Sequence, residues 1–235
     1  MKKTFLGLMA VMCCMLASCG DDEPQRIHYE SVDLGLSVRW ATMNVGALNP
    51  EDHGQLFGWA DSTGSHKTFD NITIAYRSQG STETTIVDWQ STYFGGKTPP
   101  LDISGTAYDI AFYQWNANWR MATADEWQEL IDRCTWALET TAGGATVYRV
   151  TGPNGNSIIL PMTGIRATSE TESGRNGVAR YWTSTLMPMS QQTAAGYESN
   201  VACAAYCLTA DAATGHPAIS HTVRCYGLAI RPVAR

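Results

Sequence analysis

The stretch Thr123-Ala124-Asp125-Glu126 decides how the middle of this 235-residue chain folds. It is a capping box, in which the Thr123 hydroxyl accepts the backbone N–H of Glu126 and the Glu126 carboxylate reaches back to the N–H of Thr123. Apolar side chains then recur at helical spacing, at Trp127, Leu130, Ile131 and Cys134. The pattern predicts a helix over residues 123–138.

A β-hairpin is predicted directly after this helix. Residues 146–151 and 157–162 are two strand-like runs, and Asn154-Gly155 between them supplies the positive φ of a type I′ turn. Further strands are expected over residues 29–40 (with a turn at Gly35), 56–60, 179–186, 201–209 and 223–233. This order predicts an α+β fold with a mostly antiparallel twisted sheet, one main helix and long loops.

Composition narrows the class of protein. Apolar residues make up 44% of the chain, enough to bury the core of one domain and too many for intrinsic disorder. Seven cysteines in this length rule out a small disulfide-stapled scaffold. A net charge of −6 argues against nucleic acid as a partner, because a nucleic-acid binder needs a basic face.

The N-terminus has the pattern of an export signal. Lys2 and Lys3 precede an apolar run over 5–16, which at about 12 residues is too short to span a bilayer as a helix. Leu16-Ala17-Ser18-Cys19 resembles the lipobox of bacterial lipoproteins, which implies cleavage before Cys19 and lipid attachment to its sulfur. We therefore expect a signal peptide over 1–18 and an outer-membrane lipid anchor at Cys19.

The segment after Cys19 indicates which side of the outer membrane the protein faces. Asp21-Asp22-Glu23 resembles the surface-export signal of Bacteroidota lipoproteins, and a solvated linker is the other interpretation. The first interpretation predicts a lipoprotein exposed on the cell surface, and the second leaves it facing the periplasm. We expect residues 19–27 to be a polar tether and 28–235 to be a single domain.

Five blocks, in order along the chain, carry a resemblance to one family: 33–47, 119–127, 155–161, 181–184 and 230–233. Together they resemble the Fibrobacter succinogenes-type major paralogous domains and their Bacteroidota relatives. The resemblance implies a C-type-lectin-like fold, distantly similar to formylglycine-generating enzymes, with N- and C-terminal strands that pair. It implies no activity. Ala122 replaces the family's usual Pro, and Met43 replaces a usual Cys, so a bridge from that position to Cys134 is lost.

Four cysteines follow the tether: Cys134, Cys203, Cys207 and Cys225. Cys203 and Cys207 would lie about 13 Å apart in a strand, beyond disulfide reach. A Cys207–Cys225 disulfide across adjacent strands is one option, and unpaired buried thiols are the other. Comparison with formylglycine-generating enzymes would make Cys203 and Cys207 a reactive pair, but the surrounding motif is not matched. A zinc site is disfavoured because no CxxC pair occurs.

No metal or cofactor is predicted. Asn49-Pro50-Glu51-Asp52 and residues 115–118 only loosely echo the calcium motifs of C-type lectins, which leaves calcium binding open. The five histidines show no ligand spacing and are expected at the surface or in turns: His28, His53, His66, His216 and His221. Asp61-Ser62-Thr63 resembles the short O-glycosylation sequence of Bacteroidota, so modification of Ser62 or Thr63 stays open.

A ligand site is expected in the long, weakly periodic region 61–116, because loops on a rigid scaffold commonly carry function. Its candidate residues are aromatic: Trp89, Tyr93, Phe94, Tyr108, Tyr113 and Trp115. Such rings stack on sugars or anchor protein interfaces, although they also form loop cores. We expect a non-catalytic binding or adhesion module for a glycan or surface protein. The alternatives are an enzyme related to formylglycine-generating oxidases and a structural subunit of a surface assembly.

Overall fold

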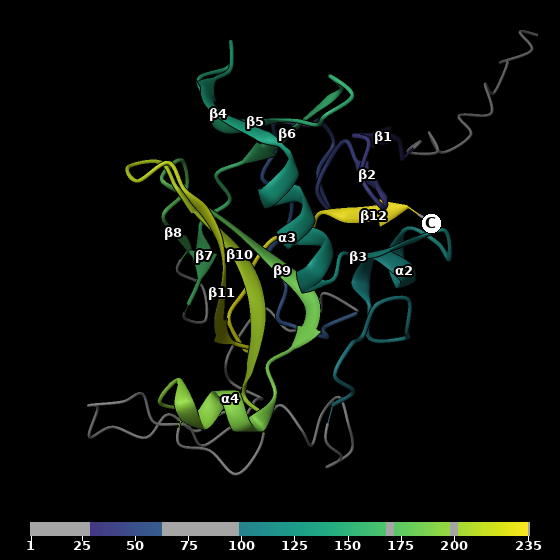
Figure 1. The fold of residues 1–235 in the computed structure, drawn as a ribbon, viewed down its shortest axis with the longest axis vertical. Helices are drawn as coiled ribbons and strands as arrows, with labels where there is room; N and C mark the ends of the chain where they lie inside the picture. Colours follow the sequence, from purple (N-terminus) through teal and green to yellow (C-terminus); the bar gives the residue numbers. More distant parts are fainter. Residues whose placement is uncertain (1–28, 63–98, 168–171, 198–201, 235) are drawn as a thin grey trace, which may run out of the picture.

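The structure is a computed structural model that describes residues 29–62, 99–167, 172–197 and 202–234 (Figure 1). Within these ranges the strands form small antiparallel sheets and the helices are few. The α+β class is therefore confirmed. The strands are β1 (Ser31–Asp33), β2 (Arg39–Ala41), β3 (Trp119–Met121), β4 (Thr135–Thr140), β5 (Thr146–Thr151), β6 (Ser157–Pro161), β7 (Ile165–Arg166), β8 (Glu172–Ser173), β9 (Val178–Leu186), β10 (Ala204–Asp211), β11 (Pro217–Val223) and β12 (Pro232–Ala234). The helices are α2 (Ile110–Gln114), α3 (Ala124–Arg133) and α4 (Met189–Ala194).

Strands from both ends of the described chain share one sheet. Its order is β1-β2-β12-β3, and all its neighbours are antiparallel. Val233 of β12 lies opposite Trp40 of β2 on one side and Arg120 of β3 on the other. The expectation that the N- and C-terminal strands pair is confirmed.

Helix α3 begins as predicted and ends early. Glu126 N donates to Thr123 Oγ1 at 3.2 Å, and Thr123 N donates to Glu126 Oε2 at 2.9 Å, which completes the capping box. The helix stops at Arg133, however, so the prediction for residues 134–138 is wrong. Cys134 is the C-cap of the helix, and residues 135–138 belong to strand β4, which pairs with β5 along its whole length. Tertiary pairing of a Thr- and Trp-containing segment outweighs the helical spacing there.

The predicted hairpin is confirmed as β5 and β6, but its turn differs. Gly155 has φ of 86° whereas Asn154 does not have a positive φ, so the type I′ prediction is wrong. A four-residue turn forms instead, closed by the Gly155 N–H on the Gly152 carbonyl at 3.0 Å. Both asparagines of the turn, Asn154 and Asn156, donate to the carbonyl of Asp33 and tie the hairpin to β1.

The remaining large sheet has the order β11-β10-β9, and α3 packs against all three strands. Strands β9 and β10 confirm the expectations for 179–186 and for most of 201–209. The expected strand over 223–233 is wrong, because β11 ends at Val223 and β12 begins at Pro232. Between them the chain makes single bridges, Phe57 with Leu228 and Tyr181 with Ala229. The expected strand over 56–60 is reduced to the Phe57 bridge.

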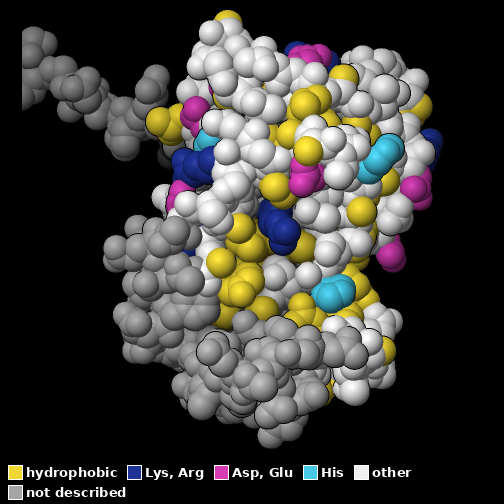
Figure 2. All heavy atoms as spheres, turned by 90° about the vertical axis from the view of Figure 1, so that its left-hand side faces the viewer, with side chains coloured by type: hydrophobic (Ala, Val, Ile, Leu, Met, Phe, Trp, Pro, Cys, Tyr) yellow, Lys and Arg dark blue, Asp and Glu magenta, His cyan; other side chains and the backbone are white. Residues whose placement is uncertain are grey.

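Two hydrophobic clusters fill the interior, one around Trp59 and Trp182 and one around Trp40 and Trp127. Trp119 is buried with the first cluster. On the face drawn in Figure 2, charged side chains of both signs are scattered singly and hydrophobic ones gather near the middle. In the described part of the chain, no helix has the length and apolarity needed to cross a membrane.

Candidate functional site

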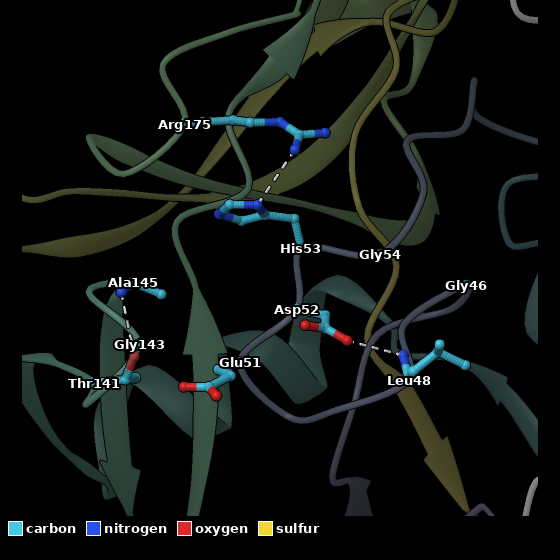
Figure 3. Close-up of a pocket in the computed structure, with 10 residues that line it drawn as sticks. All are labelled: Gly46, Leu48, Glu51, Asp52, His53, Gly54, Thr141, Gly143, Ala145 and Arg175. Atoms are coloured by element: carbon cyan, nitrogen blue, oxygen red, sulfur yellow. Dashed lines mark hydrogen bonds between the residues drawn. The ribbon is translucent and has the colours of Figure 1, made fainter.

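A cleft of about 530 Å³ opens where three loops meet (Figure 3). The loops are 46–54 after β2, the turn between β4 and β5, and the turn between β8 and β9. The lining residues are Gly46, Leu48, Glu51, Asp52, His53, Gly54, Thr141, Gly143, Ala145 and Arg175. They lie far apart in the sequence, so the tertiary fold alone brings them together.

A buried arginine fixes the base of loop 46–54. Arg231 donates from Nε to Asn44 Oδ1, from Nη1 to the Ala41 carbonyl and from Nη2 to the Ile159 carbonyl, each at 2.8 Å. Burial lowers the pKa of Arg231 to about 10, so the guanidinium remains charged at neutral pH. Asn44 in turn donates from Nδ2 to the His53 carbonyl at 2.9 Å. The cleft loop is therefore tied to the C-terminal strand through fully buried groups.

The ends of the same loop come together tightly. The Gln55 N–H donates to the Val45 carbonyl at 3.0 Å and closes the loop. Gly54 has φ of 72°, and a Cβ atom there would lie only 2.5 Å from the Val45 carbonyl oxygen. Glycine is therefore required at this position, because any side chain would collide with backbone.

Asp52 and Glu51 have different roles in the loop. Asp52 Oδ2 accepts the backbone N–H groups of Leu48 at 3.1 Å and Asn49 at 2.8 Å, which holds the loop tip in shape. Leu48 stands at the rim with 72% of its surface exposed. The Glu51 side chain extends toward the Thr141–Gly143 side of the cleft (Figure 3) and makes no hydrogen bond or ion pair with a described residue. Its carboxylate is available to a ligand.

Figure 3 shows His53 beside Arg175, with Glu51 on the other side of the histidine. Its Nδ1 atom is 3.4 Å from Arg175 Nη1, and Arg175 also forms an ion pair with Glu172. Burial, and then the charge of Arg175, lowers the pKa of His53 below its ordinary value, while Glu172, Asp52 and the side chain of Asn176 offset part of that effect. The imidazole is therefore neutral at neutral pH, with an Nδ1 lone pair that can face the guanidinium.

These groups together suit a polar ligand. Glu51 offers a carboxylate acceptor, Arg175 offers N–H donors, and Thr141 offers a hydroxyl at the far wall. A ligand with several hydroxyls, or with hydrogen-bond donors and acceptors close together, could form hydrogen bonds with all three side chains. The hydroxyl of Thr141 is also used locally, because it accepts the Ala145 N–H at 3.2 Å.

The aromatic residues predicted as a ligand site do not form one site in the described chain. Trp115 is buried, and it stacks on Tyr29 with ring centroids 3.8 Å apart and packs edge-on against Trp119. It belongs to the core and has no free face. Tyr108 is half-buried against the same core, whereas Tyr113 on α2 is 63% exposed. Three candidates, Trp89, Tyr93 and Phe94, lie outside the described residues, as does the lipidation candidate Cys19.

The described cysteines are thiols. The predicted Cys207–Cys225 disulfide is not formed, because Cys207 sits opposite Ser220 and Trp182 in its sheet, whereas Cys225 lies beyond the end of β11. Burial raises the pKa of both thiols to about 12 and that of Cys134 to about 11, so they stay protonated at neutral pH. Ser62, the first glycosylation candidate, is only 9% exposed, and Thr63 lies outside the described residues.

Comparison with known proteins adds no relative: no family model, curated protein or solved structure matches this chain. Across the residues that the structure describes, no three His, Cys, Asp or Glu side chains are grouped so as to hold a metal ion. The sequence alone did not predict the cleft. Gly46 and Gly54 on either side of Asn49-Pro50-Glu51-Asp52 were the one local signal that a shaped loop lies there.

Proposed function

We propose that this chain is a surface-exposed lipoprotein whose folded part is a non-catalytic binding module, and that its ligand occupies the cleft beside Glu51 and His53. A glycan is the favoured ligand, because hydroxyl pairs on a sugar ring can accept from Arg175 and donate to Glu51 at the same time. On this proposal the loops carry recognition and the sheets only hold them in place.

One observation carries the proposal, namely the availability of the Glu51 carboxylate within a cleft whose walls are otherwise fixed. Loop 46–54 is held by Asn44 and Asp52, so little ordering is required when a ligand arrives. Preorganised walls reduce the entropic cost of binding. The volume of about 530 Å³ lies within the range of small-molecule sites.

The broader setting belongs to the same proposal. The lipobox-like segment at Cys19 and the acidic segment after it support an outer-membrane anchor that faces outward. The five sequence blocks support membership in the Fibrobacter-type family and a C-type-lectin-like fold. Pairing of the two terminal strands agrees with that fold, since it joins the first and last blocks.

Glycan-array binding of the full chain, purified in mild detergent, tests the proposed ligand class. A Gly143→Tyr variant would fill the cleft, and its backbone permits a side chain because a Cβ there has only ordinary contacts. Gln128→Tyr on the exposed face of α3 is the matched control. We expect the wild-type chain and the control to bind the same glycans and Gly143→Tyr to lose them. Equal binding by all three chains would exclude the cleft, and no array signal from the wild type would contradict a glycan ligand.

A further inference from the structure

Strand β4 is the outer strand of the β4-β5-β6 sheet, at the top of the molecule in Figure 1. All six of its residues pair in register with β5, from Thr135 opposite Thr151 to Thr140 opposite Thr146, with no bulge. On its other side, β4 makes no backbone hydrogen bond to any described residue. Its outward-facing N–H and C=O groups therefore have no backbone partner among the described residues.

This edge lacks the usual protection. Natural sheets block strand addition with Lys, Pro, bulges or very short edges. The sequence of β4, Thr135-Trp136-Ala137-Leu138-Glu139-Thr140, contains no Lys, Pro or Gly. Its single charge is already matched, since Arg149 Nε lies 2.9 and 3.0 Å from the two Glu139 carboxylate oxygens. Leu138 leaves 45% of its surface exposed beside this edge.

We propose that β4 pairs with β4 of a second copy of this chain, antiparallel and about a two-fold axis through Ala137. The two three-stranded sheets then join into one sheet of twice the width. Cross-strand partners point to the same face of a sheet, so a symmetric pairing must centre on a residue. Centred on Ala137, the pairing places Trp136 opposite the partner's Leu138 and Thr135 opposite the partner's Glu139.

The chemistry of β4 favours this axis over axes at Leu138 and Glu139. An axis at Glu139 would set two like charges directly opposite each other, which destabilises a sheet. An axis at Leu138 would leave Trp136 opposite the partner's Thr140. With the axis at Ala137, the apolar Trp136–Leu138 pair forms twice, and the two Glu139 residues lie about 13 Å apart along the strands. The exposed part of Leu138 then lies beside the partner's Trp136, whose indole is held by the Leu130 carbonyl at 3.3 Å and by the Tyr148 ring.

A second copy is therefore the occupant that the strand's own residues fit. One strand pair buries less than the roughly 1,200–2,000 Å² of a stable specific interface, so the dimer should be weak in solution. Anchoring both copies to one membrane would raise their effective concentration.

Disulfide trapping tests the pairing directly. In the full chain in mild detergent, Ala137→Cys places two thiols opposite each other at the axis, where Cα atoms of paired strands lie about 4.5–5.5 Å apart, within disulfide range. Gln128→Cys on α3 is the control for random collisions, and the unchanged chain reports any background from its native thiols. With oxidised glutathione as the oxidant, we expect Ala137→Cys to form covalent dimers at least about tenfold faster than the control.

A second change separates strand pairing from chance contact. Leu138→Lys, added to Ala137→Cys, places a charge on the edge and should abolish the excess cross-linking. Thr135→Glu, at an exposed position on the opposite face of the strand, would lie directly opposite the partner's Glu139 and should also abolish the excess, because like charges opposite each other destabilise a sheet. Thermal melting shows whether each variant is folded. The proposal is overturned if Ala137→Cys cross-links no faster than Gln128→Cys. It is also overturned if either of these two variants, when folded, cross-links as fast as before.

Discussion

Two polar regions of this molecule lie one behind the other and differ in how completely they are hydrogen-bonded. Behind the cleft, the buried Arg231 guanidinium has a partner for each of its three nitrogens. In the cleft, the Glu51 carboxylate has no partner among the described residues, and Arg175 and His53 meet only loosely at 3.4 Å. A satisfied buried network rigidifies a fold, whereas unsatisfied groups at a surface hollow remain available for a ligand. On the proposed function, the first region stabilises the fold and the second binds the ligand.

The largest effect is expected at Arg231. Arg231→Leu leaves three buried acceptors without donors, at about 1–3 kcal/mol each, so the free energy of unfolding should fall by at least about 3 kcal/mol. Arg149→Leu is the matched control, because the half-exposed Arg149–Glu139 pair should contribute no more than about 1 kcal/mol. Urea unfolding of both variants measures the difference. Similar losses would show that Arg231 is not the structural centre of the region.

Variants at Trp115 and Tyr113 distinguish a residue of the core from a residue of the predicted aromatic site. Trp115→Ala removes a buried ring stacked on Tyr29 and should cost about 3 kcal/mol. Tyr113→Ala, on the exposed side of the same short helix, should stay within about 0.5 kcal/mol. Thermal and urea unfolding report both values. If Trp115→Ala were as stable as Tyr113→Ala, Trp115 would not be part of the core.

The Glu51→Gln variant tests whether the cleft binds the ligand. Glu51→Gln keeps the shape of the side chain and removes its charge, so stability should change by less than about 0.5 kcal/mol. Affinity for a glycan selected on the array should fall about tenfold or more, since hydrogen bonds to a charged group contribute about 1.5–3 kcal/mol. Asp125→Asn, an exposed carboxylate on α3, is the control. Unchanged affinity for Glu51→Gln would remove that residue from the site.

The smallest effect is a pH dependence from His53. Its pKa is lowered in the folded protein, so between the unfolded value near 6.5 and the folded value the unfolded chain binds more protons. Stability should therefore be full above about pH 6.5 and decline as the pH falls through that window. His53→Gln should lose this part of the slope. Identical pH profiles for the two chains would show that His53 does not carry the shift.

Local chemistry made part of the fold predictable. The capping box at Thr123 marked the start of α3, because both of its hydrogen bonds join residues three apart. The end of α3 was not predictable from helical spacing, since pairing with β5 draws residues 135–140 into a strand. The hairpin followed from two strand-like runs, but its turn type was not predictable, because Asn154 is engaged with the distant Asp33 carbonyl.

The site was harder to predict than the fold. Loop residues such as Glu51, Thr141 and Arg175 share no spacing, and only the packed sheets bring them to one cleft. The aromatic candidates were predicted as a site because they lie near one another in the sequence. Asp109 caps the start of the short helix α2, at whose end Trp115 is buried in the core while Tyr113 is exposed. Spacing along the chain could not show which face of an unpredicted helix is buried.

Hydrogen–deuterium exchange of the full chain, with and without a glycan selected on the array, tests the assignment of binding to the cleft most directly. We predict slower exchange in loop 46–54 and in the turn 141–145 when the glycan is bound, with no change in α2 around Tyr113. Protection confined to α2 and its neighbours, with loop 46–54 unchanged, would contradict the account and place the ligand on the aromatic side of the molecule.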